Sequence, residues 1–354
     1  MLGIALAGFH HTFGAYDQLV QFSNTANLTL GDTRLINVNN TELSAIILFQ
    51  NTTNVTVNNL VTYGCSSGYI LQFDDIMDDL SGNLVQLQRS NFSNSPAGGI
   101  TIGNHSLFVQ DTTFDTLAAI NHDNADGATL SVSSCSFNNV ASAINLAQAR
   151  LSLTYSNITN SGGGYAVVVI YSDGASVSDN TSQIVTIDTC QFLYNNASQG
   201  ALYMLGYDNN PQQTLNIYNS NFSQNYGLLY NMLGGAVTVY AVEVVNIERC
   251  WFQANRARTG LGAVYVYGFE THVTSLTVLD IIFLGNNGAQ EALAPTELAA
   301  LTDTGECGGL YASYCQCVAI SGCVLKITLA LGCAFMVLVQ MGHLAWQVAQ
   351  TSSM

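Results

Sequence analysis

The sequence of 354 residues predicts an all-β protein, a parallel β-helix of about ten coils followed by a C-terminal hydrophobic helix. Two observations predict the β-helix. One phrase, written VNIERCWFQANRARTGLGAVYV in residues 245–266, returns along most of the chain with small changes. Each copy holds two short runs in which apolar and polar residues alternate, which is the pattern of β-strands. A third observation, an apolar and almost uncharged run after residue 317, predicts the helix.

The repeat has a constant register. A Cys, Ser or Ile follows three residues after the last apolar residue of the first run, and a phenylalanine stands two residues beyond it in the clearest copies. An asparagine comes three residues later, and a glycine then leads into the second run. The last apolar residues of the first run are Leu30, Val57, Leu87, Val109, Val132, Leu153, Ile187, Ile217, Ile247 and Val278, spaced 21 to 34 residues apart. This period predicts stacked units rather than one globular core.

The second half of each unit decides which repeat fold is expected. Leucine-rich repeats have a similar period, but their second half is helical or extended with further leucines. Here a glycine precedes apolar residues with a period of two, as in QGALYML and LGAVYVY. Each unit is therefore expected to be strand, turn and strand with a third segment of variable length, which is one coil of a parallel β-helix.

Equivalent positions in successive coils are expected to form ladders, because paired strands lie about 4.8 Å apart. The phenylalanines predicted to stack inside are Phe192, Phe222, Phe252 and Phe283. The asparagines predicted at the corner, where an αL conformation is tolerated and amides bond from coil to coil, are Asn195, Asn225, Asn255 and Asn286. Both ladders are structural predictions.

The alternation of a glycine-glycine-alanine-apolar run, as in GGAVTVY, with phenylalanine-x-x-asparagine resembles the repeat signature of the chlamydial polymorphic outer membrane proteins. It is also similar to the wider pectin-lyase-like superfamily. The resemblance covers residues 183–289 and, more weakly, 84–170. It implies a right-handed β-helix used in adhesion or surface display. The motif indicates a fold and not by itself a function.

The composition is typical of an extracellular chain. Charged residues make up 8%, the net charge is −16 and there are only seven lysines and arginines, so nucleic acid and anionic membrane surfaces are poor partners. A glycan or a cell-surface protein is the expected partner, and the expected location is the cell surface or secretion. The sequons predicted as glycosylation sites are Asn27, Asn39, Asn51, Asn54, Asn91, Asn104, Asn157, Asn180, Asn196 and Asn221. A chain rich in Asn, Ser and Thr also produces sequons by chance.

Seven of the nine cysteines fall into two groups. Cys135, Cys190 and Cys250 share an interior ladder position but are separated by serine coils, so we expect small buried hydrophobes that are too far apart for disulfides. The second group, Cys307, Cys315, Cys317 and Cys323, follows the predicted array of residues 24–289 and is expected to form a disulfide-bonded collar in a linker over residues 290–317. Their pairing is open, and a metal site is the weaker alternative because no histidine lies near.

The two ends of the chain are less regular. Residues 318–350 are predicted to form the hydrophobic helix, and residues 327–346 supply about the twenty apolar residues that cross a bilayer. A membrane span is expected; the alternative is a helix that caps the open solenoid, which Gln340 and His343 favour. Residues 1–23 are apolar at their start but have no basic region or cleavage signal, so they are expected to be either a truncated signal or a cap.

Residues with catalytic potential are expected in loops that follow the second run of each coil. His122, Asp123 and Asp126 are the candidates for acid–base catalysis, and Asp123, Asp126, Asp173 and Asp179 are the candidates for a weak Ca²⁺ site. No other cofactor is expected. The alternative is that these carboxylates keep an otherwise uncharged protein soluble. No arginine or lysine is expected among them, which disfavours a lyase.

Binding is therefore predicted rather than catalysis, with a polysaccharide lyase or glycoside hydrolase that uses the acidic loops as the alternative. Tyr203, Tyr240, Tyr265 and Tyr267 alternate with apolar residues in the second run and are expected to point outward. Outward tyrosines suit sugar rings, although tyrosine is also an ordinary strand residue.

Overall fold

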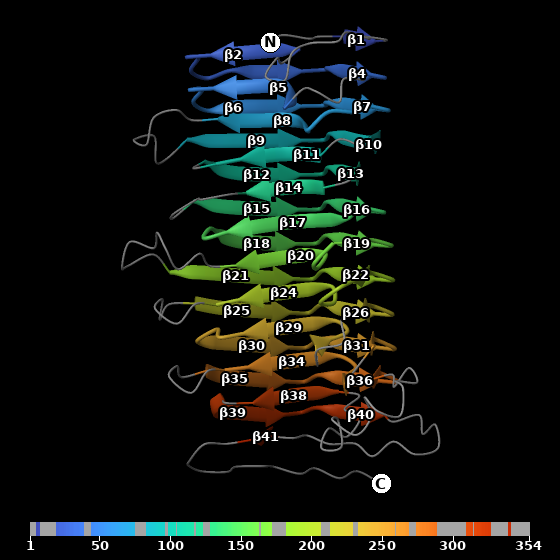
Figure 1. Cartoon of the computed structure of the whole chain (residues 1–354). Coiled ribbons are helices and arrows are strands. Elements are labelled where there is room, and N and C mark those ends of the chain that lie inside the picture. The colour runs from blue at the N-terminus through green and yellow to red at the C-terminus, as the bar shows by residue number, and fades with distance from the viewer. Residues whose placement is uncertain are drawn as a thin grey trace, which may run out of the picture. The chain divides into compact units, whose positions relative to one another are not determined.

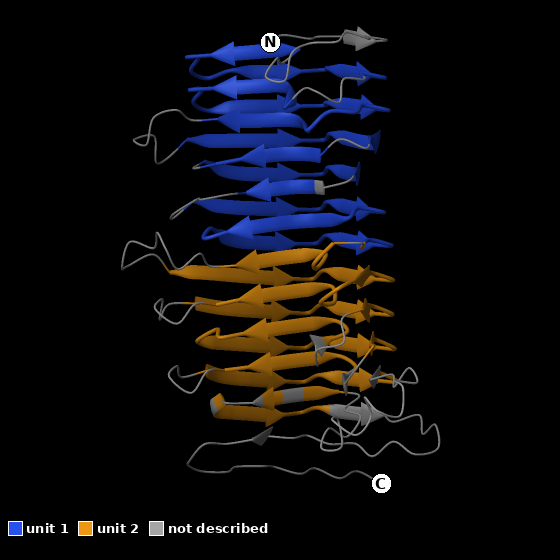
Figure 2. Ribbon diagram, in the orientation of Figure 1, with its two compact units in different colours: residues 1–161 blue, residues 162–354 orange. Residues whose placement is uncertain are grey.

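The computed structural model describes residues 5–7, 19–38, 44–74, 83–95, 98–103, 105–116, 118–122, 128–162, 164–171, 182–206, 213–228, 233–258, 260–268, 274–288, 309–313, 315–326 and 339–340. These residues form β-strands, turns and bends, without helices. The chain divides into two compact units, residues 1–161 and 162–354 (Figure 2). Each unit is a stack of coils in which every described strand pairing is parallel (Figure 1).

The first unit is built from three parallel sheets, and each coil contributes one strand to each sheet. The first sheet contains β3 (Thr29–Gly31), β6 (Val55–Asn58), β9 (Leu84–Gln88), β12 (Ser106–Gln110), β15 (Thr129–Ser133) and β18 (Arg150–Thr154). The second contains β1 (Ala5–Ala7), β4 (Arg34–Ile36), β7 (Val61–Tyr63), β10 (Asn91–Ser95), β13 (Thr113–Thr116), β16 (Ser136–Asn138) and β19 (Asn157–Thr159). The third contains β2 (Val20–Ser23), β5 (Ala45–Gln50), β8 (Tyr69–Asp74), β11 (Gly98–Ile102), β14 (Ala118–His122) and β17 (Ser142–Ala147).

The second unit repeats this plan. Its first sheet contains β21 (Gln183–Asp188), β25 (Gln213–Tyr218), β30 (Val244–Glu248), β35 (Thr274–Leu279) and β39 (Cys315–Ser321). Its second contains β22 (Gln191–Leu193), β26 (Asn221–Ser223), β31 (Trp251–Gln253), β36 (Ile282–Leu284) and β40 (Val324–Lys326). Its third contains β20 (Val168–Tyr171), β24 (Leu202–Leu205), β29 (Val237–Tyr240), β34 (Val264–Tyr267), β38 (Leu310–Ser313) and β41 (Val339–Gln340).

Short strands follow the asparagine corners of the second unit. They are β23 (Asn196–Ala197), β27 (Tyr226–Gly227), β32 (Arg256–Ala257) and β37 (Asn287–Gly288), which pair with one another, and β28 (Leu233–Gly234) with β33 (Gly260–Leu261). The architecture is thus all-β with coils of parallel strands, as expected. It differs from the expectation in one respect: the phenylalanine belongs to a strand of its own, so each coil has three main strands rather than two.

The interior of each unit is filled by ladders of apolar side chains. In the first sheet of unit 2, Ile187, Ile217, Ile247 and Val278 occupy equivalent positions on adjacent strands, and all four are at most 1% exposed. The corresponding ladder of unit 1 consists of Leu30, Val57, Leu87, Val109, Val132 and Leu153. Period-2 alternation buries these residues and leaves their neighbours on the outer face.

Phenylalanines stack beside this ladder. The ring centroids of Phe192, Phe222, Phe252 and Phe283 are 4.5, 5.1 and 5.4 Å apart in turn, with near-parallel ring planes. In unit 1, Phe92, Phe114 and Phe137 stack in the same way at 5.0 and 4.9 Å. The strand spacing sets these distances, so each ring covers the next and excludes water from the second sheet.

The asparagines form a second ladder. The side-chain amide of Asn195 donates to Asn225 Oδ1 at 2.9 Å, Asn225 donates to Asn255 at 2.9 Å and Asn255 donates to Asn286 at 2.9 Å. The same amide nitrogens of Asn225, Asn255 and Asn286 also donate to the carbonyl oxygens of Phe192, Phe222 and Phe252. These bonds satisfy polar groups that the corner would otherwise bury unpaired.

The backbone conformation at these corners differs from the prediction. The αL residues are not the asparagines but the residues just before them: Tyr194, Gln224, Ala254 and Gly285, with φ between 50° and 60°. The chain turns at these exposed or partly exposed residues, and the asparagine that follows points inward. Asn195, Asn225 and Asn255 are therefore buried, at no more than 1% exposed.

The described coils extend beyond both predicted ends of the array. In the segment 1–23, β1 pairs with β4 and β2 pairs with β5. In the predicted linker and helix, β38, β39 and β40 pair with β34, β35 and β36 and so form one more coil. Residues 318–326 are strand and turn rather than helix, because Val318 and Ile320 continue the alternation of β35.

The predicted span over residues 327–346 lies outside the described residues except at Val339–Gln340, which form β41 and pair with β38. Among the residues that the structure describes, no helix has the length and hydrophobicity needed to cross a bilayer.

Candidate functional site

The four predicted binding tyrosines come together on the outer face of the third sheet of unit 2. With Tyr165 they form what we call the tyrosine cluster: Tyr165, Tyr203, Tyr240, Tyr265 and Tyr267. The ring of Tyr165 meets Tyr203 edge-on at 5.0 Å, and Tyr203 lies 6.1 Å from Tyr240. Tyr240 in turn contacts Tyr265 at 5.3 Å and Tyr267 at 5.8 Å.

Strand register explains the cluster. Tyr203, Thr238 and Tyr265 are equivalent positions on β24, β29 and β34, and Leu205, Tyr240 and Tyr267 are equivalent positions two residues further along. Alternation turns both columns outward, so the rings of neighbouring strands meet across the sheet.

The exposure of the cluster is uneven. Tyr203 and Tyr265 are only 5% and 6% exposed, which contradicts the expectation that all four rings face solvent. They are covered by their neighbours, because aromatic rings about 5 Å apart shield each other. Tyr240 and Tyr267 are partly exposed, and Tyr165 is 50% exposed. Partners can therefore reach Tyr165, Tyr240 and Tyr267.

The hydroxyl groups of Tyr203 and Tyr240 stay neutral. Burial, and then a hydrogen bond with the Tyr165 side chain, raise the pKa of Tyr203 above its ordinary value. Burial also raises the pKa of Tyr240. A neutral phenol can both donate and accept, so the cluster offers hydrogen bonds without charge.

The same sheet has a different outer face in unit 1. There the amide of Asn145 donates to Asn121 Oδ1 at 2.9 Å, and Asn121 lies 3.5 Å from Thr101 Oγ1. Polar ladders thus cover β11, β14 and β17 without any aromatic ring, so the solenoid does not itself require tyrosines on this face. Tyr165 was not predicted, since it stands in a glycine-rich connection without strand periodicity.

The predicted catalytic histidine is buried. His122 is 0% exposed and occupies an inward column between Ile102 and Leu146, with its Nε2 atom 2.9 Å from the carbonyl oxygen of His105. Burial lowers the pKa of His122 to about 4. The prediction of a loop histidine was wrong, because Ile120 and His122 lie two residues apart on the same strand and face the same interior. A buried imidazole cannot act on a polysaccharide in solvent.

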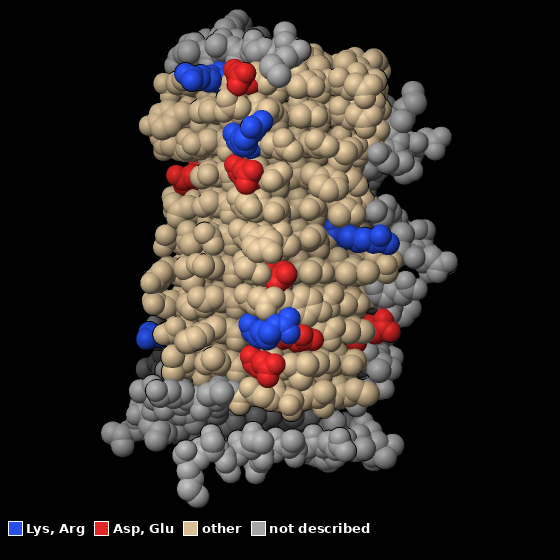
Figure 3. All heavy atoms as spheres, turned by 180° about the vertical axis from the view of Figure 1, so that it is seen from behind, with Lys and Arg blue, Asp and Glu red and all other residues tan. Residues whose placement is uncertain are grey.

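The acidic candidates Asp123, Asp126, Asp173 and Asp179 lie outside the described residues. Within the described ranges, no group of three or more His, Cys, Asp or Glu side chains is arranged to hold a metal ion. Charged side chains are sparse on the face drawn in Figure 3.

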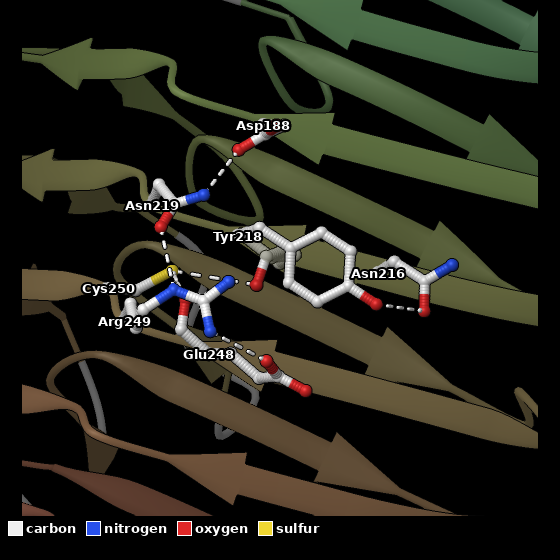
Figure 4. A network of polar contacts seen from close by, with 8 residues as sticks. Asp188, Asn216, Tyr218, Asn219, Glu248, Arg249 and Cys250 are labelled. Atoms are coloured by element: carbon white, nitrogen blue, oxygen red, sulfur yellow. Dashed lines mark hydrogen bonds and ion pairs between the residues drawn. The ribbon is translucent and has the colours of Figure 1, made fainter.

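One arginine stands beside carboxylates at the strand ends of the first sheet, a different set from the predicted loop carboxylates. Arg249 Nη1 lies 3.1 Å from Glu248 Oε2, and Arg249 Nε donates to Asn219 Oδ1 at 2.8 Å. Asn219 donates in turn to Asp188 Oδ1 at 2.7 Å (Figure 4). Asn219 and Arg249 are both αL residues of the corner after the first sheet, so the corner brings them side by side. These contacts link side chains of three successive coils, which indicates a structural role for the network.

Among the described residues, Cys315, Cys317 and Cys323, three of the four cysteines of the predicted collar, form no disulfide bond with one another. Cys315 is buried in β39, whereas Cys317 and Cys323 are exposed, and Cys307 lies outside the described residues. Cys135, Cys190 and Cys250 are buried as expected, and burial raises the pKa values of Cys135 and Cys250 to about 12. These two thiols stay protonated and act as small apolar side chains.

The sequons differ in accessibility. Asn27, Asn54, Asn91, Asn157 and Asn196 are exposed, Asn51 and Asn221 are partly buried, and Asn39, Asn104 and Asn180 lie outside the described residues. Asn54 Nδ2 already donates to Asn27 Oδ1 at 3.1 Å. Asn91 and Asn157 project from the outer face of the second sheet, which leaves them the better glycosylation candidates.

No protein-family model, curated protein or solved structure matches the chain. The resemblance to polymorphic outer membrane proteins therefore rests on the repeat phrase. The parallel sheets support the β-helix architecture and no particular family.

Proposed function

We propose that this chain is a non-catalytic recognition protein that binds glycans or cell-surface proteins through the tyrosine cluster. The observation that carries the proposal is the aromatic outer face of the third sheet in unit 2. A β-helix needs apolar ladders in its interior, but it does not need aromatic rings on this outer face. The corresponding face of unit 1 is covered by amides. Tyr165, Tyr240 and Tyr267 offer partly exposed rings and hydroxyl groups in one patch.

The chemistry of the patch suits a neutral partner. Aromatic rings pack against the apolar face of a sugar or against apolar side chains, and the phenol groups supply the polar contacts. A chain with so few lysines and arginines has little attraction for polyanions.

The alternative is a polysaccharide lyase or hydrolase that uses the acidic loops. The burial of His122 removes the one histidine proposed as its base, so the alternative depends on Asp123 and Asp126. Turnover of polygalacturonate or alginate, with and without Ca²⁺, would establish the enzyme, provided that Asp123→Ala and Asp126→Ala abolish it.

A glycan and cell-surface array probed with the full chain tests the binding proposal. We expect the double variant Tyr240→Ala/Tyr267→Ala to lose most binding, whereas Tyr63→Ala, which removes an exposed tyrosine of unit 1, retains it. Thermal unfolding of the same variants separates binding from stability. The proposal fails if the double variant is destabilised yet binds normally, because the cluster would then be packing alone.

Location and handedness belong to the same proposal. We place the chain at the cell surface or outside the cell as a glycoprotein, with right-handed coils, since strand–crossover–strand connections are overwhelmingly right-handed. The apolar run 327–346 acts either as a membrane anchor or as a cap on the array, and the pairing of β41 with β38 favours the cap. Extraction of membranes with alkaline carbonate distinguishes the anchor from the cap, because an anchored chain stays in the membrane pellet.

A further inference from the structure

A second candidate site lies on the outer face of the first sheet in unit 1. Strands β9, β12 and β15 border a pocket of about 340 Å³, and the outward side chains that line it are Gln86, Gln88, Phe108, Gln110, Ser131 and Ser133. We call these six residues the glutamine groove. Pockets that hold small ligands start at about this volume.

The register explains the hollow. Gln86, Phe108 and Ser131 are equivalent positions on the three strands, and Gln88, Gln110 and Ser133 form the adjacent column. Long side chains on β9 and β12 thus stand next to the short serines of β15. Because the serine side chains are shorter than the glutamine and phenylalanine side chains, open space remains beside the ring of Phe108.

Phe108 is unusual among the phenylalanines that the structure describes. The others are buried or partly buried, and most of them stack in the interior, whereas Phe108 is on the outer face and 45% exposed. An exposed phenylalanine contributes nothing to the core and exposes apolar area to water. Its ring forms an apolar wall of an otherwise polar pocket.

The polar groups of the groove are not used by the protein. Among the described residues, the side-chain amides of Gln86, Gln88 and Gln110 make no hydrogen bond to protein atoms. Elsewhere in the same unit, amides on the outer face pair with each other: Gln21 Nε2 donates to Gln50 Oε1 at 2.8 Å. The groove therefore presents donors and acceptors that a ligand can take up.

The groove contains no charge. The charged residues nearest along the chain, Arg89 and Asp111, are αL residues of the corner beyond the strand ends, and Arg89 Nε donates to Asn58 Oδ1 at 3.1 Å. A charged ligand would find no counter-charge among the six groove residues. A peptide strand would find no free backbone either, because β12 pairs on one side with β9 and on the other with β15.

We propose that the glutamine groove binds a neutral carbohydrate chain, with one sugar ring packed on Phe108 and its hydroxyls bonded to the glutamine amides and serine hydroxyls. Aromatic packing against the apolar face of the ring supplies the affinity, and amides that both donate and accept match hydroxyl groups. The site is separate from the tyrosine cluster and does not depend on it.

Titration calorimetry with the full chain tests the proposal. The probes are the neutral oligosaccharides cellohexaose, xylohexaose and mannohexaose, with hexagalacturonate as the charged comparison. We expect at least one neutral probe to bind, Phe108→Ala to weaken that binding by about tenfold or more, and Phe108→Tyr to retain it. Gln88→Ala should weaken it several-fold through the loss of uncharged hydrogen bonds.

The matched control is Tyr155→Ala, which removes an aromatic side chain of the same unit that is 64% exposed and lies outside the groove. This variant should bind normally. The proposal is overturned if no neutral probe binds, if hexagalacturonate binds as tightly, or if Phe108→Ala binds as well as the native chain.

The two proposals fail separately. Loss of neutral-sugar binding in Phe108→Ala but not in Tyr240→Ala/Tyr267→Ala supports the groove and counts against the tyrosine cluster as a glycan site. The reverse result overturns the groove and leaves the cluster.

Discussion

Replacing His122 with leucine should remove a defined part of the pH dependence of stability. His122 is fully buried in an inward column, and Ile102 and Leu146 lie on either side of it. Burial holds the pKa of His122 at about 4, compared with 6.5 for the unperturbed group. Leucine suits the same column and cannot be protonated.

The sign and size of the effect on the free energy of unfolding follow from proton linkage. Between pH 6.5 and 4 the unfolded chain binds a proton at His122 while the folded chain does not, so the free energy of unfolding falls as the pH falls. A difference of 2.5 pKa units corresponds to about 3 kcal/mol, reached near pH 4, below which both states are protonated and the loss stops. At pH 7.5 the variant loses only the contact with the His105 carbonyl oxygen, about 1 kcal/mol.

Denaturant unfolding of both proteins at pH 7.5, 6.5, 5.5 and 4.5 measures the effect. Carboxylates also titrate in this range, but they are common to both proteins and cancel in the difference. We expect the native chain to lose stability relative to His122→Leu as the pH falls. Asn121→Leu, at the outward-facing neighbour, should keep the native pH slope. Equal slopes for the native chain and His122→Leu would refute the burial argument.

Two further predictions concern the ladders. Phe222→Ala should lower the free energy of unfolding by about 3 to 5 kcal/mol, because a cavity opens between the retained rings of Phe192 and Phe252; Phe222→Leu should cost less, and equal costs would contradict the stacking. Asn225→Ala should cost about 3 kcal/mol, since Asn225 donates to Phe192 O and Asn255 Oδ1 and accepts from Asn195. Asn286→Ala, at the end of the ladder, should cost less, and chemical denaturation of both variants checks the order.

Much of the fold could be predicted because the residues that define each coil lie close together in the sequence. The ten apolar residues that define the register form one inward ladder in each unit, and the stacked rings of Phe192 and Phe222 follow from the same spacing. The additional coil at residues 310–326 was missed since no phenylalanine or asparagine marks it and about twenty other residues precede it. The alternation of Ile120 and His122 was itself a signal for an inward histidine.

The candidate sites were harder to predict. The sequence places Tyr240 and Tyr267 on an outer face, but which rings cover one another depends on the register between strands. Likewise, Gln88 and Ser133 look like ordinary solvated residues in the sequence. The hollow between them exists only because β12 lies between a strand with long outward side chains and a strand with short ones.

The constant half of the coil also limits how this chain can vary. In the four coils of unit 2 that have a corner asparagine, this asparagine always stands eight positions after the last inward residue of the first sheet, as Asn225 does after Ile217. Adding a single residue there would turn every later inward side chain of that coil toward water and disconnect the amide ladder. Length differences can accumulate only after that corner, in the connections from the second sheet to the third and from the third back to the first, or by gain and loss of entire coils. Its surface can therefore diversify by loop insertion and coil duplication while the interior stays the same.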